Sequence, residues 1–220
     1  MKQTFVVQVN GLDAAASGAM RFARNTPGAA ARALNSAIAD SRARLVEAAK
    51  ERYALTAAGE RHLEKLRQTE RASASRPVAK MSISTPISDM GYFESFPDVP
   101  LPGTRWREAP KEGFRGHILR STPMYTLSGK DNRSKAFLAR FNSGHVGMVQ
   151  RVVGSNALAG SKSAYVKPTR WRTRDGRVEK LVTVGALSGA AQVNKVWPEN
   201  EQAAADDFLK ALDRVMEGST

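Results

Sequence analysis

The sequence contains no cysteine among its 220 residues. This absence excludes disulfide frameworks, thiolate zinc sites and cysteine nucleophiles, so the composition carries no mark of an oxidising compartment. The longest weakly polar run, residues 181–193, is shorter than the ~20 apolar residues that a membrane-spanning helix needs. The apolar stretch that follows Lys2 is also too short for a secretory signal peptide, whose hydrophobic part takes about 7–15 residues. We therefore expect synthesis in a cytoplasm and no membrane contact.

Residue patterns that carry catalysis or metal binding are missing as well. His62, His117 and His145 are scattered, and no acidic residue stands at ligand spacing from them. The glycines of 154–163 are spaced differently from those of a phosphate-binding loop, because five residues separate them and Ser161 precedes the lysine. No Gly-x-Ser-x-Gly elbow occurs either. We expect no enzyme activity, no metal ion and no cofactor.

Positive charge is plentiful and unevenly placed. The 34 Lys and Arg exceed the 21 Asp and Glu by 13. Residues 111–198 hold 16 basic and 4 acidic residues (+12), whereas residues 199–220 hold 2 and 6 (−4). A field of this strength attracts polyanions and acidic partners. A solvated basic surface without a ligand is the alternative that charge alone leaves open.

The first third of the sequence is predicted to be largely helical, over about 13–72. An Ala-rich stretch at 13–24 is expected to form a helix, and Thr26-Pro27 is a helix-start signal. From Pro27 to about Tyr53, small apolar residues recur every three or four positions, which predicts an amphipathic helix with an alanine stripe. The more polar segment 60–72 is predicted to be a solvated helix, or else a helix that packs on another subunit.

Strict alternation over 78–85 predicts a half-buried strand, and 4–9 predicts another. Residues 86–113 then break the pattern with five of the ten prolines, and a loop of this length is uncommon in a compact domain unless it is functional or disordered. We expect an arm that lies on a neighbouring subunit, with a loop folded over its own core as the alternative. The residues proposed for the interface in this segment are Tyr92, Phe93, Phe96 and Trp106.

The rest of the sequence predicts an antiparallel sheet over about 114–185 and a C-terminal helix over about 199–217. Strands are expected at 114–119, 136–141, 147–153 and 181–184, and 169–178 forms a hairpin with Asp175-Gly176 at its tip. Four arginines of this hairpin are candidates for contact with a polyanion or an acidic partner: Arg170, Arg172, Arg174 and Arg177. The fold class is therefore α+β, one domain over 1–220 with a long N-terminal Ala-rich helix and a C-terminal helix packed on the sheet.

Three segments, taken in order, resemble the minor tail protein Z family of lambda-like tailed bacteriophages, whose members are tail completion or neck proteins. They are Pro27-Gly-Ala-Ala-Ala-Arg-Ala-Leu-Asn-Ser-Ala-Ile38, Ala136-Phe-Leu-Ala-Arg-Phe-Asn-Ser-Gly-His-Val-Gly-Met-Val-Gln-Arg151 and Val184-Gly-Ala-Leu-Ser-Gly-Ala-Ala-Gln-Val193. The first is similar to the family's opening helix, and the second to its hairpin ending in a hydrophobic residue, Gln and Arg. In the third, Ala186-Leu187 stands where the family often has a Gly-Pro-Ser turn.

The resemblance implies a virion protein, made in a bacterial host, that completes the head-proximal end of the tail tube. It would act as a homo-oligomeric ring, of six copies, around the DNA channel, between tail terminator and head–neck connector proteins. Leu187 and Trp197 join the interface candidates. The alternative function is that of a stand-alone basic nucleic-acid-binding protein that contacts the backbone through the 162–180 region.

Overall fold

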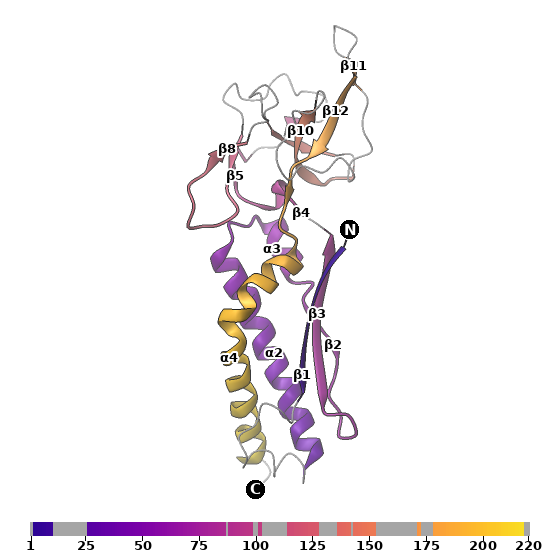
Figure 1. The fold of residues 1–220 in the computed structure, drawn as a ribbon, viewed down its shortest axis with the longest axis vertical. Coiled ribbons are helices and arrows are strands. Elements are labelled where there is room, and N and C mark those ends of the chain that lie inside the picture. The colour runs from indigo at the N-terminus through magenta and orange to yellow at the C-terminus, as the bar shows by residue number, and fades with distance from the viewer. Residues whose placement is uncertain are drawn as a thin grey trace. The chain divides into compact units, whose positions relative to one another are not determined.

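The computed structural model describes residues 2–10, 26–86, 88–98, 101–102, 114–127, 136–141, 143–152, 171–172 and 178–217. The chain forms two compact units. Unit 1 consists of Met1–Lys50, His62–Pro86 and Gly189–Thr220, and unit 2 consists of Glu51–Arg61 and Ile87–Ser188. The expected helix at 13–24, Trp106 and three of the hairpin arginines (Arg170, Arg174 and Arg177) lie outside the described residues. The architecture confirms the α+β class, with helices and small antiparallel sheets (Figure 1).

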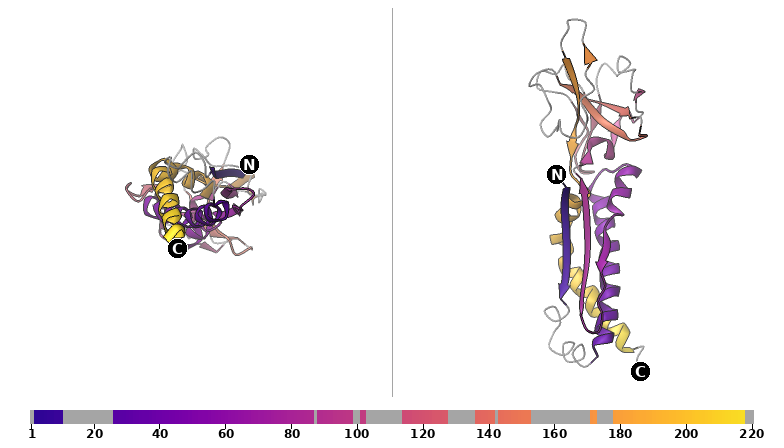
Figure 2. Two further views of the ribbon diagram at one scale, coloured as in Figure 1. Left: turned by 90° about the horizontal axis from the view of Figure 1, so that it is seen from below. Right: turned by 90° about the vertical axis from the view of Figure 1, so that its right-hand side faces the viewer.

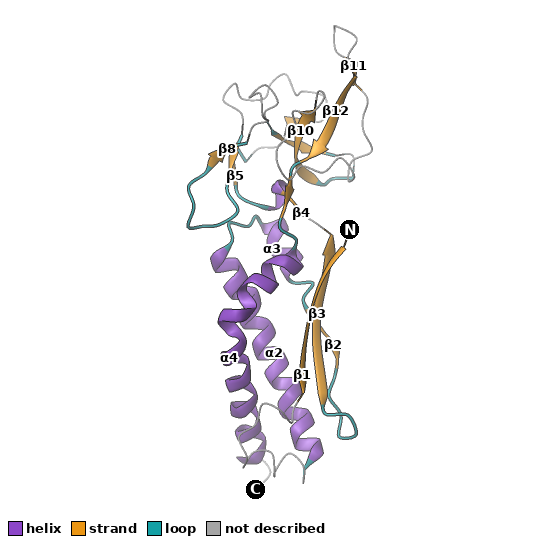
Figure 3. Cartoon of the chain, in the orientation of Figure 1, coloured by secondary structure: helices purple, strands orange, loops and turns teal. Residues whose placement is uncertain are grey.

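The long helix α2, Pro27–Arg52, confirms the predicted Ala-rich helix of unit 1. It begins where the Thr26-Pro27 signal placed its start, and the Thr26 carbonyl accepts hydrogen bonds from Ala29 and Ala30. Its buried face is built mainly of alanine, with Leu34, Ile38 and Leu45 as the large members. Side chains this small let a neighbouring backbone approach closely, and α4, Gly189–Glu217, runs beside α2 (Figure 3).

A three-stranded antiparallel sheet of order β1-β3-β2 completes unit 1 (Figure 2). Its strands are β1 (Lys2–Asn10), β2 (Arg67–Glu70) and β3 (Val78–Pro86). Along β3 the side chains of Ala79, Met81, Ile83 and Thr85 are buried, and the residues between them are not. This period of two is the one that the sequence predicted. Residues 78–86 of β3 pair in register with β1, from Lys2↔Pro86 to Asn10↔Val78.

The prediction of a solvated helix over 60–72 is wrong. Helix α3 spans Ala57–Leu63, and β2 follows it after a short turn. Leu63 and Leu66, the two large apolar residues of the segment, are both fully buried. The carbonyl of Leu66 accepts a hydrogen bond from the Arg42 guanidinium at 2.5 Å, so side chains of α2 hold the turn in place. Tertiary contacts therefore decide the conformation of this segment, because its polar composition favours neither a helix nor a strand.

Helix α4 starts ten residues before the predicted start at 199. Its first turn is held by β3, because the hydroxyl of Thr85 accepts a hydrogen bond from the Ala190 amide at 3.1 Å. Pro198 thus lies inside the helix and not at its first position. A proline there has no N–H to donate and displaces the carbonyl four residues before it, which bends a helix. Figure 1 shows α4 changing direction along its length.

Unit 2 is built around a five-stranded sheet of order β11-β12-β10-β9-β6. The strands are β6 (Leu101–Pro102), β9 (Phe137–Arg140), β10 (Val146–Val152), β11 (Trp171–Arg172) and β12 (Val178–Thr183). All neighbours are antiparallel except β6 and β9. The predicted strands at 136–141 and 147–153 are confirmed as β9 and β10, and the strand predicted at 181–184 corresponds to β12.

Short elements fill much of the segment that was expected to be a loop at 86–113. They are β4 (Ser88–Asp89), the 3-10 helix η1 (Met90–Tyr92), β5 (Ser95–Phe96) and β6. β4 pairs with β13 (Gly185–Ala186), and β5 belongs to a second sheet of order β5-β7-β8, with β7 at Arg115–Gly116 and β8 at Tyr125–Thr126. The strand expected over 114–119 is therefore only two residues long. Met90, Phe93 and Phe114 are fully buried in this region.

A buried carboxylate joins the two long helices of unit 1. Asp207 of α4 is 6% exposed, and it accepts hydrogen bonds from the Arg44 guanidinium at 2.7 Å and from the Ser41 hydroxyl at 3.4 Å. The pKa of Arg44 is raised above its ordinary value, chiefly by this hydrogen bond. A second pair between the same helices, Arg214 with Asp40 at 3.3 Å, is exposed on both sides.

We predict that Asp207→Ala lowers the free energy of unfolding by about 1–2 kcal/mol, because it leaves a partly buried guanidinium without its carboxylate. The control Asp40→Ala breaks the exposed pair between the same helices and should change stability by less than about 0.5 kcal/mol. Chemical denaturation of the two variants measures both values. Equal denaturation midpoints for the two variants would show that the buried pair stabilises unit 1 no more than the exposed pair does.

Candidate functional site

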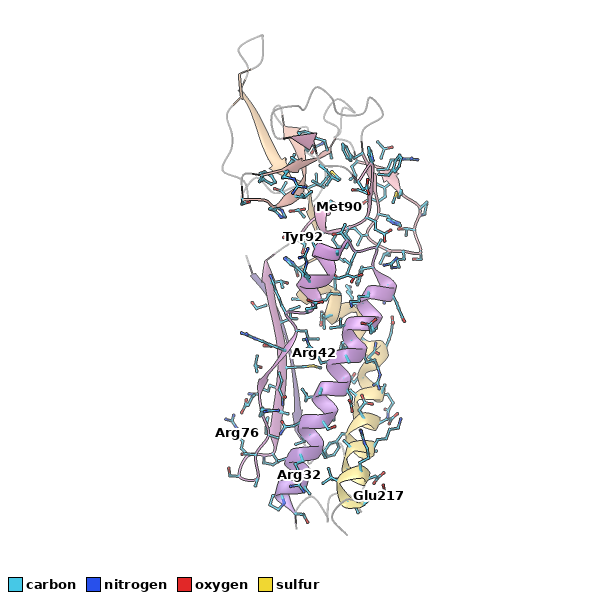
Figure 4. The ribbon with its side chains drawn as sticks, turned by 180° about the vertical axis from the view of Figure 1, so that it is seen from behind. Arg32, Arg42, Arg76, Met90, Tyr92 and Glu217 are labelled. Carbon is cyan, nitrogen blue, oxygen red and sulfur yellow. The ribbon has the colours of Figure 1, made fainter. Side chains whose placement is uncertain are left out.

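The aromatic residues proposed for a subunit interface differ widely in exposure. Phe93 is fully buried in unit 2, where Leu55 forms a β-bridge with it, so the prediction that it lies at an interface is wrong. Tyr92 is half-buried beside it on η1 (Figure 4). Phe96 is 58% exposed on β5. The two later candidates, Leu187 and Trp197, are half-buried, in unit 2 and unit 1 respectively. The segment is thus partly folded over its own core.

The arginine hairpin is described only at its base. Strand β11 pairs with β12 through Trp171↔Glu179 and Arg172↔Val178, which is the antiparallel pairing that a hairpin over 169–178 predicts. Arg172 is placed through its backbone alone. The turn with Asp175-Gly176, and the side chains of the four arginines, lie outside the described residues. Their proposed contact with a polyanion stays a prediction.

A buried carboxylate in unit 2, Asp89, is surrounded by polar and titratable groups. This residue ends β4 and caps η1, and its side chain is 9% exposed. One carboxylate oxygen, Oδ1, accepts the Gly91 amide at 2.6 Å and the Met148 amide at 3.4 Å. The other, Oδ2, accepts from Nε2 of His145 at 2.8 Å. A single carboxylate therefore connects η1 with the start of β10.

Aromatic rings flank the histidine of this pair. The Phe141 ring stacks on the His145 ring with centroids 5.8 Å apart, and the Tyr92 ring lies 5.4 Å away at a tilt of 39°. Phe141 and His145 stand at the two ends of a tight turn, in which the Gly144 amide donates to the Phe141 carbonyl. Gly144 has a φ of +81°, which is the left-handed conformation that glycine adopts without strain. The predicted turn between β9 and β10 is thus present.

Two glycines allow the backbone of η1 to touch β10. A Cβ added to Gly91 would lie 2.7 Å from the Gly147 Cα and 2.7 Å from the Val146 carbonyl oxygen. A Cβ on Gly147 would lie 3.1 Å from Nε2 of His145 and 3.2 Å from Oδ2 of Asp89. The carboxylate can reach both amides and the imidazole only because these positions carry no side chain.

The pKa of His145 is raised above its ordinary value, first by the hydrogen bond to Asp89, with burial acting in the opposite direction. The pKa of Tyr92 is raised by burial and by the charge of Asp89. Both shifts favour the protonated form of the side chain, the imidazolium of His145 and the neutral phenol of Tyr92, beside the carboxylate of Asp89. The arrangement orients an imidazole as a carboxylate–histidine pair does in many sites, and we assign it the role of holding η1 on the sheet.

The sequence pattern singled out neither His145 nor Asp89 as a site residue. The only available signal was the Asn142-Ser143-Gly144 turn before His145, which locates the histidine but not its partner 56 residues away. No group of three or more metal-ligating side chains occurs among the described residues. No helix in the part of the chain that the structure describes is both long and apolar enough to cross a membrane.

Comparisons with protein-family models, with curated proteins and with solved structures found no match to this chain.

We predict that Gly91→Ala destabilises unit 2 by about 2–3 kcal/mol, because the added methyl group would overlap backbone atoms of β10. Gly28→Ala is the matched control. A Cβ at Gly28 has only the tip of Arg32 near it, at 4.0 Å, so this change should leave stability unchanged or raise it by up to about 1 kcal/mol. Thermal and denaturant unfolding compare the two. A Gly91→Ala variant as stable as the wild type would refute the close backbone contact.

The Asp89–His145 pair should make stability depend on pH near neutrality. Because the folded-state pKa of His145 lies above its unfolded value of about 6.5, the contribution is complete below that value and is lost as pH rises through the folded pKa. We expect the wild type to lose up to about 1 kcal/mol more than His145→Gln between pH 6 and 9, since the histidine side chain is 36% exposed. Parallel pH profiles for the two proteins would contradict the assignment.

Proposed function

We propose that the chain is a structural virion protein that completes the head-proximal end of a phage tail and joins the tail to the neck. The observation that carries this proposal is the kind and order of the elements that hold the three resembling segments. The first segment starts helix α2, the second forms the β9–β10 hairpin, and the third contains β13 and the start of α4. The helix and the hairpin of the first two segments are the conformations that the resemblance implies for them, which supports the proposal.

The hairpin gives the most detailed support. β9 and β10 pair from Phe137↔Val149 to Arg140↔Val146, and the turn between them closes through the Phe141 amide, which donates to the His145 carbonyl at 2.8 Å. At its end stands the hydrophobic-Gln-Arg signature, in which the Gln150 side chain is fully buried. The signature glutamine of the resemblance is therefore part of the core of unit 2 and contributes to packing.

The charge distribution supports a position around DNA or beside an acidic ring. Six copies at +13 each would carry +78, a field that favours a polyanion in the channel or an acidic neighbouring component. Residues 111–198, with their net charge of +12, include the predicted arginine hairpin. In this role the chain would contact tail terminator and head–neck connector proteins and, without sequence preference, the channel DNA.

A stand-alone basic nucleic-acid-binding protein is the second candidate, and the same net charge favours it. The two functions differ in what the purified chain does. A stand-alone binder retains DNA as a monomer, with an affinity that falls steeply with salt. A tail component is found in purified particles, and particles that lack it are incomplete.

We predict that changing Arg170, Arg172, Arg174 and Arg177 together to Gln leaves the fold intact but blocks completion of particles. The loss of four positive charges removes the local field that attracts the polyanion or acidic partner. The control changes four exposed bases of unit 1 to Gln and lowers the net charge equally: Arg32, Lys65, Arg67 and Arg71. Electron microscopy, infectious titre and circular dichroism measure the outcome. Normal titre with the hairpin variant would overturn the role of the hairpin, and absence of the chain from purified particles would overturn the tail function.

A further inference from the structure

Exposed large hydrophobic side chains are concentrated on one small sheet of unit 2. Among the described residues four such side chains occur: Phe96 at 58% exposure, Tyr125 at 49%, Met216 at 38% and Met124 at 37%. Phe96, Tyr125 and Met124 lie in or directly next to the β5-β7-β8 sheet. Scattered exposed hydrophobic residues need no explanation, but a group of them on one element indicates an interaction surface.

One face of this sheet packs inward and the other faces away from the core. Gly116 of β7 is buried, and a Cβ there would meet Met90 at 3.2 Å and Leu127 at 3.4 Å. Its neighbour Arg115 is exposed and pairs across the sheet with Phe96 and Thr126. Because successive residues of a strand point to opposite faces, this row of three lies on the outer face.

On the outer face of this sheet, an arginine side chain lies over an aromatic ring. The guanidinium carbon of Arg115 lies 5.3 Å from the centre of the Phe96 ring. Glu94, which directly precedes β5, pairs with His117 and Arg120, each at 3.3 Å. No carboxylate pairs with Arg115 in the described part of the chain. Tyr125 pairs with Gly116 and belongs to the other row of the sheet. We call Phe96, Arg115 and the adjoining Met124 the arginine–aromatic patch.

Helix α4 carries a surface of matching chemistry. After Pro198 the chain has a net charge of −4, against +12 for the segment 111–198 that contains Arg115. Four exposed acids of α4 are spaced by seven, seven and four residues, which places them on one helix face: Glu199, Asp206, Asp213 and Glu217. The exposed Lys210 lies on this face between Asp206 and Asp213, so after Pro198 the acids outnumber the bases there by four to one. Met216, the fourth exposed large hydrophobic side chain, precedes Glu217 in the last turn of the helix.

We infer that the arginine–aromatic patch of one copy binds the acidic face of α4 on a second copy of this chain. A carboxylate from α4 pairs with the Arg115 guanidinium, and apolar contact with Phe96 and Met124 adds to it. Arginine and aromatic residues are the types that most often anchor protein interfaces. The patch belongs to unit 2 and the acidic face to unit 1, so the contact joins two different surfaces.

An interface between unlike surfaces is heterologous, and repeated copies then close into a ring or continue as a filament. This contact is the kind that the proposed tail ring requires, and the inference rests on that proposal in taking a second copy as the partner. The evidence for the surface itself is independent, because it comes from exposure, pairing and charge.

Charge reversal on each side tests the contact in the full-length protein. Arg115→Glu changes the patch, and Asp206→Lys with Asp213→Lys changes the helix. We expect each variant alone to weaken self-association at least about tenfold in sedimentation velocity at low salt, because like charges then face each other. An equimolar mixture of the two variants should assemble again, since every contact in an alternating assembly pairs opposite charges. Restoration in the mixture would show that the contact is between chains.

The control Arg32→Glu makes the same charge change as Arg115→Glu on an exposed position of α2 and should assemble like the wild type. Circular dichroism verifies that all variants are folded. Wild-type assembly by the reversed variants, or a mixture that does not reassemble, would overturn this interface and leave the tail function standing. A wild-type chain that stays monomeric at every concentration would also overturn it, while its presence in purified particles would still decide the tail function.

Discussion

The Asp89 carboxylate is the interaction on which the arrangement of unit 2 depends most directly. It replaces water around one buried charge with two backbone amides and an imidazole, and these donors come from η1 and β10, which are far apart in sequence. A buried charge is stable only when such donors surround it. The carboxylate thus fixes where η1 lies on the sheet, and Met90 and Phe93 enter the core on either side of it.

Periodicity and helix-start signals predicted the elements whose conformation is set locally. The alanine stripe of α2, the alternation along β3 and the glycine turn before His145 all depend on neighbours within a few residues. The errors fall where distant residues decide. The C-terminal helix was predicted to start at about 199, but it starts ten residues earlier, where the Thr85 hydroxyl accepts a hydrogen bond from the Ala190 amide. The helix predicted over 60–72 ends at Leu63, and Arg42 of α2 holds the turn that follows by donating to the carbonyls of Glu64 and Leu66.

Exposure of the aromatic residues could not be predicted for a similar reason. Tyr92, Phe93 and Phe96 lie within five residues of one another, yet one is half-buried, one fully buried and one mostly exposed. The difference arises because η1 turns the chain, so that Phe93 meets Leu55 while Phe96 continues into a sheet beside Arg115. The aromatic content of the segment indicates a surface that can bind a partner. Only the path of the backbone decides which of its rings is exposed.

Unit 1 is built from three separate stretches of the chain, and this affects how it folds during synthesis. Helix α4 leaves the ribosome only after the 102 residues Ile87–Ser188 have been made. During that interval the alanine-rich face of α2 has no helix to pack against. Contacts between residues so far apart form late and slow the folding of a chain. Until then Ser41 and Arg44 face solvent without Asp207. The nascent chain therefore exposes an apolar helix face to chaperones before unit 1 is complete.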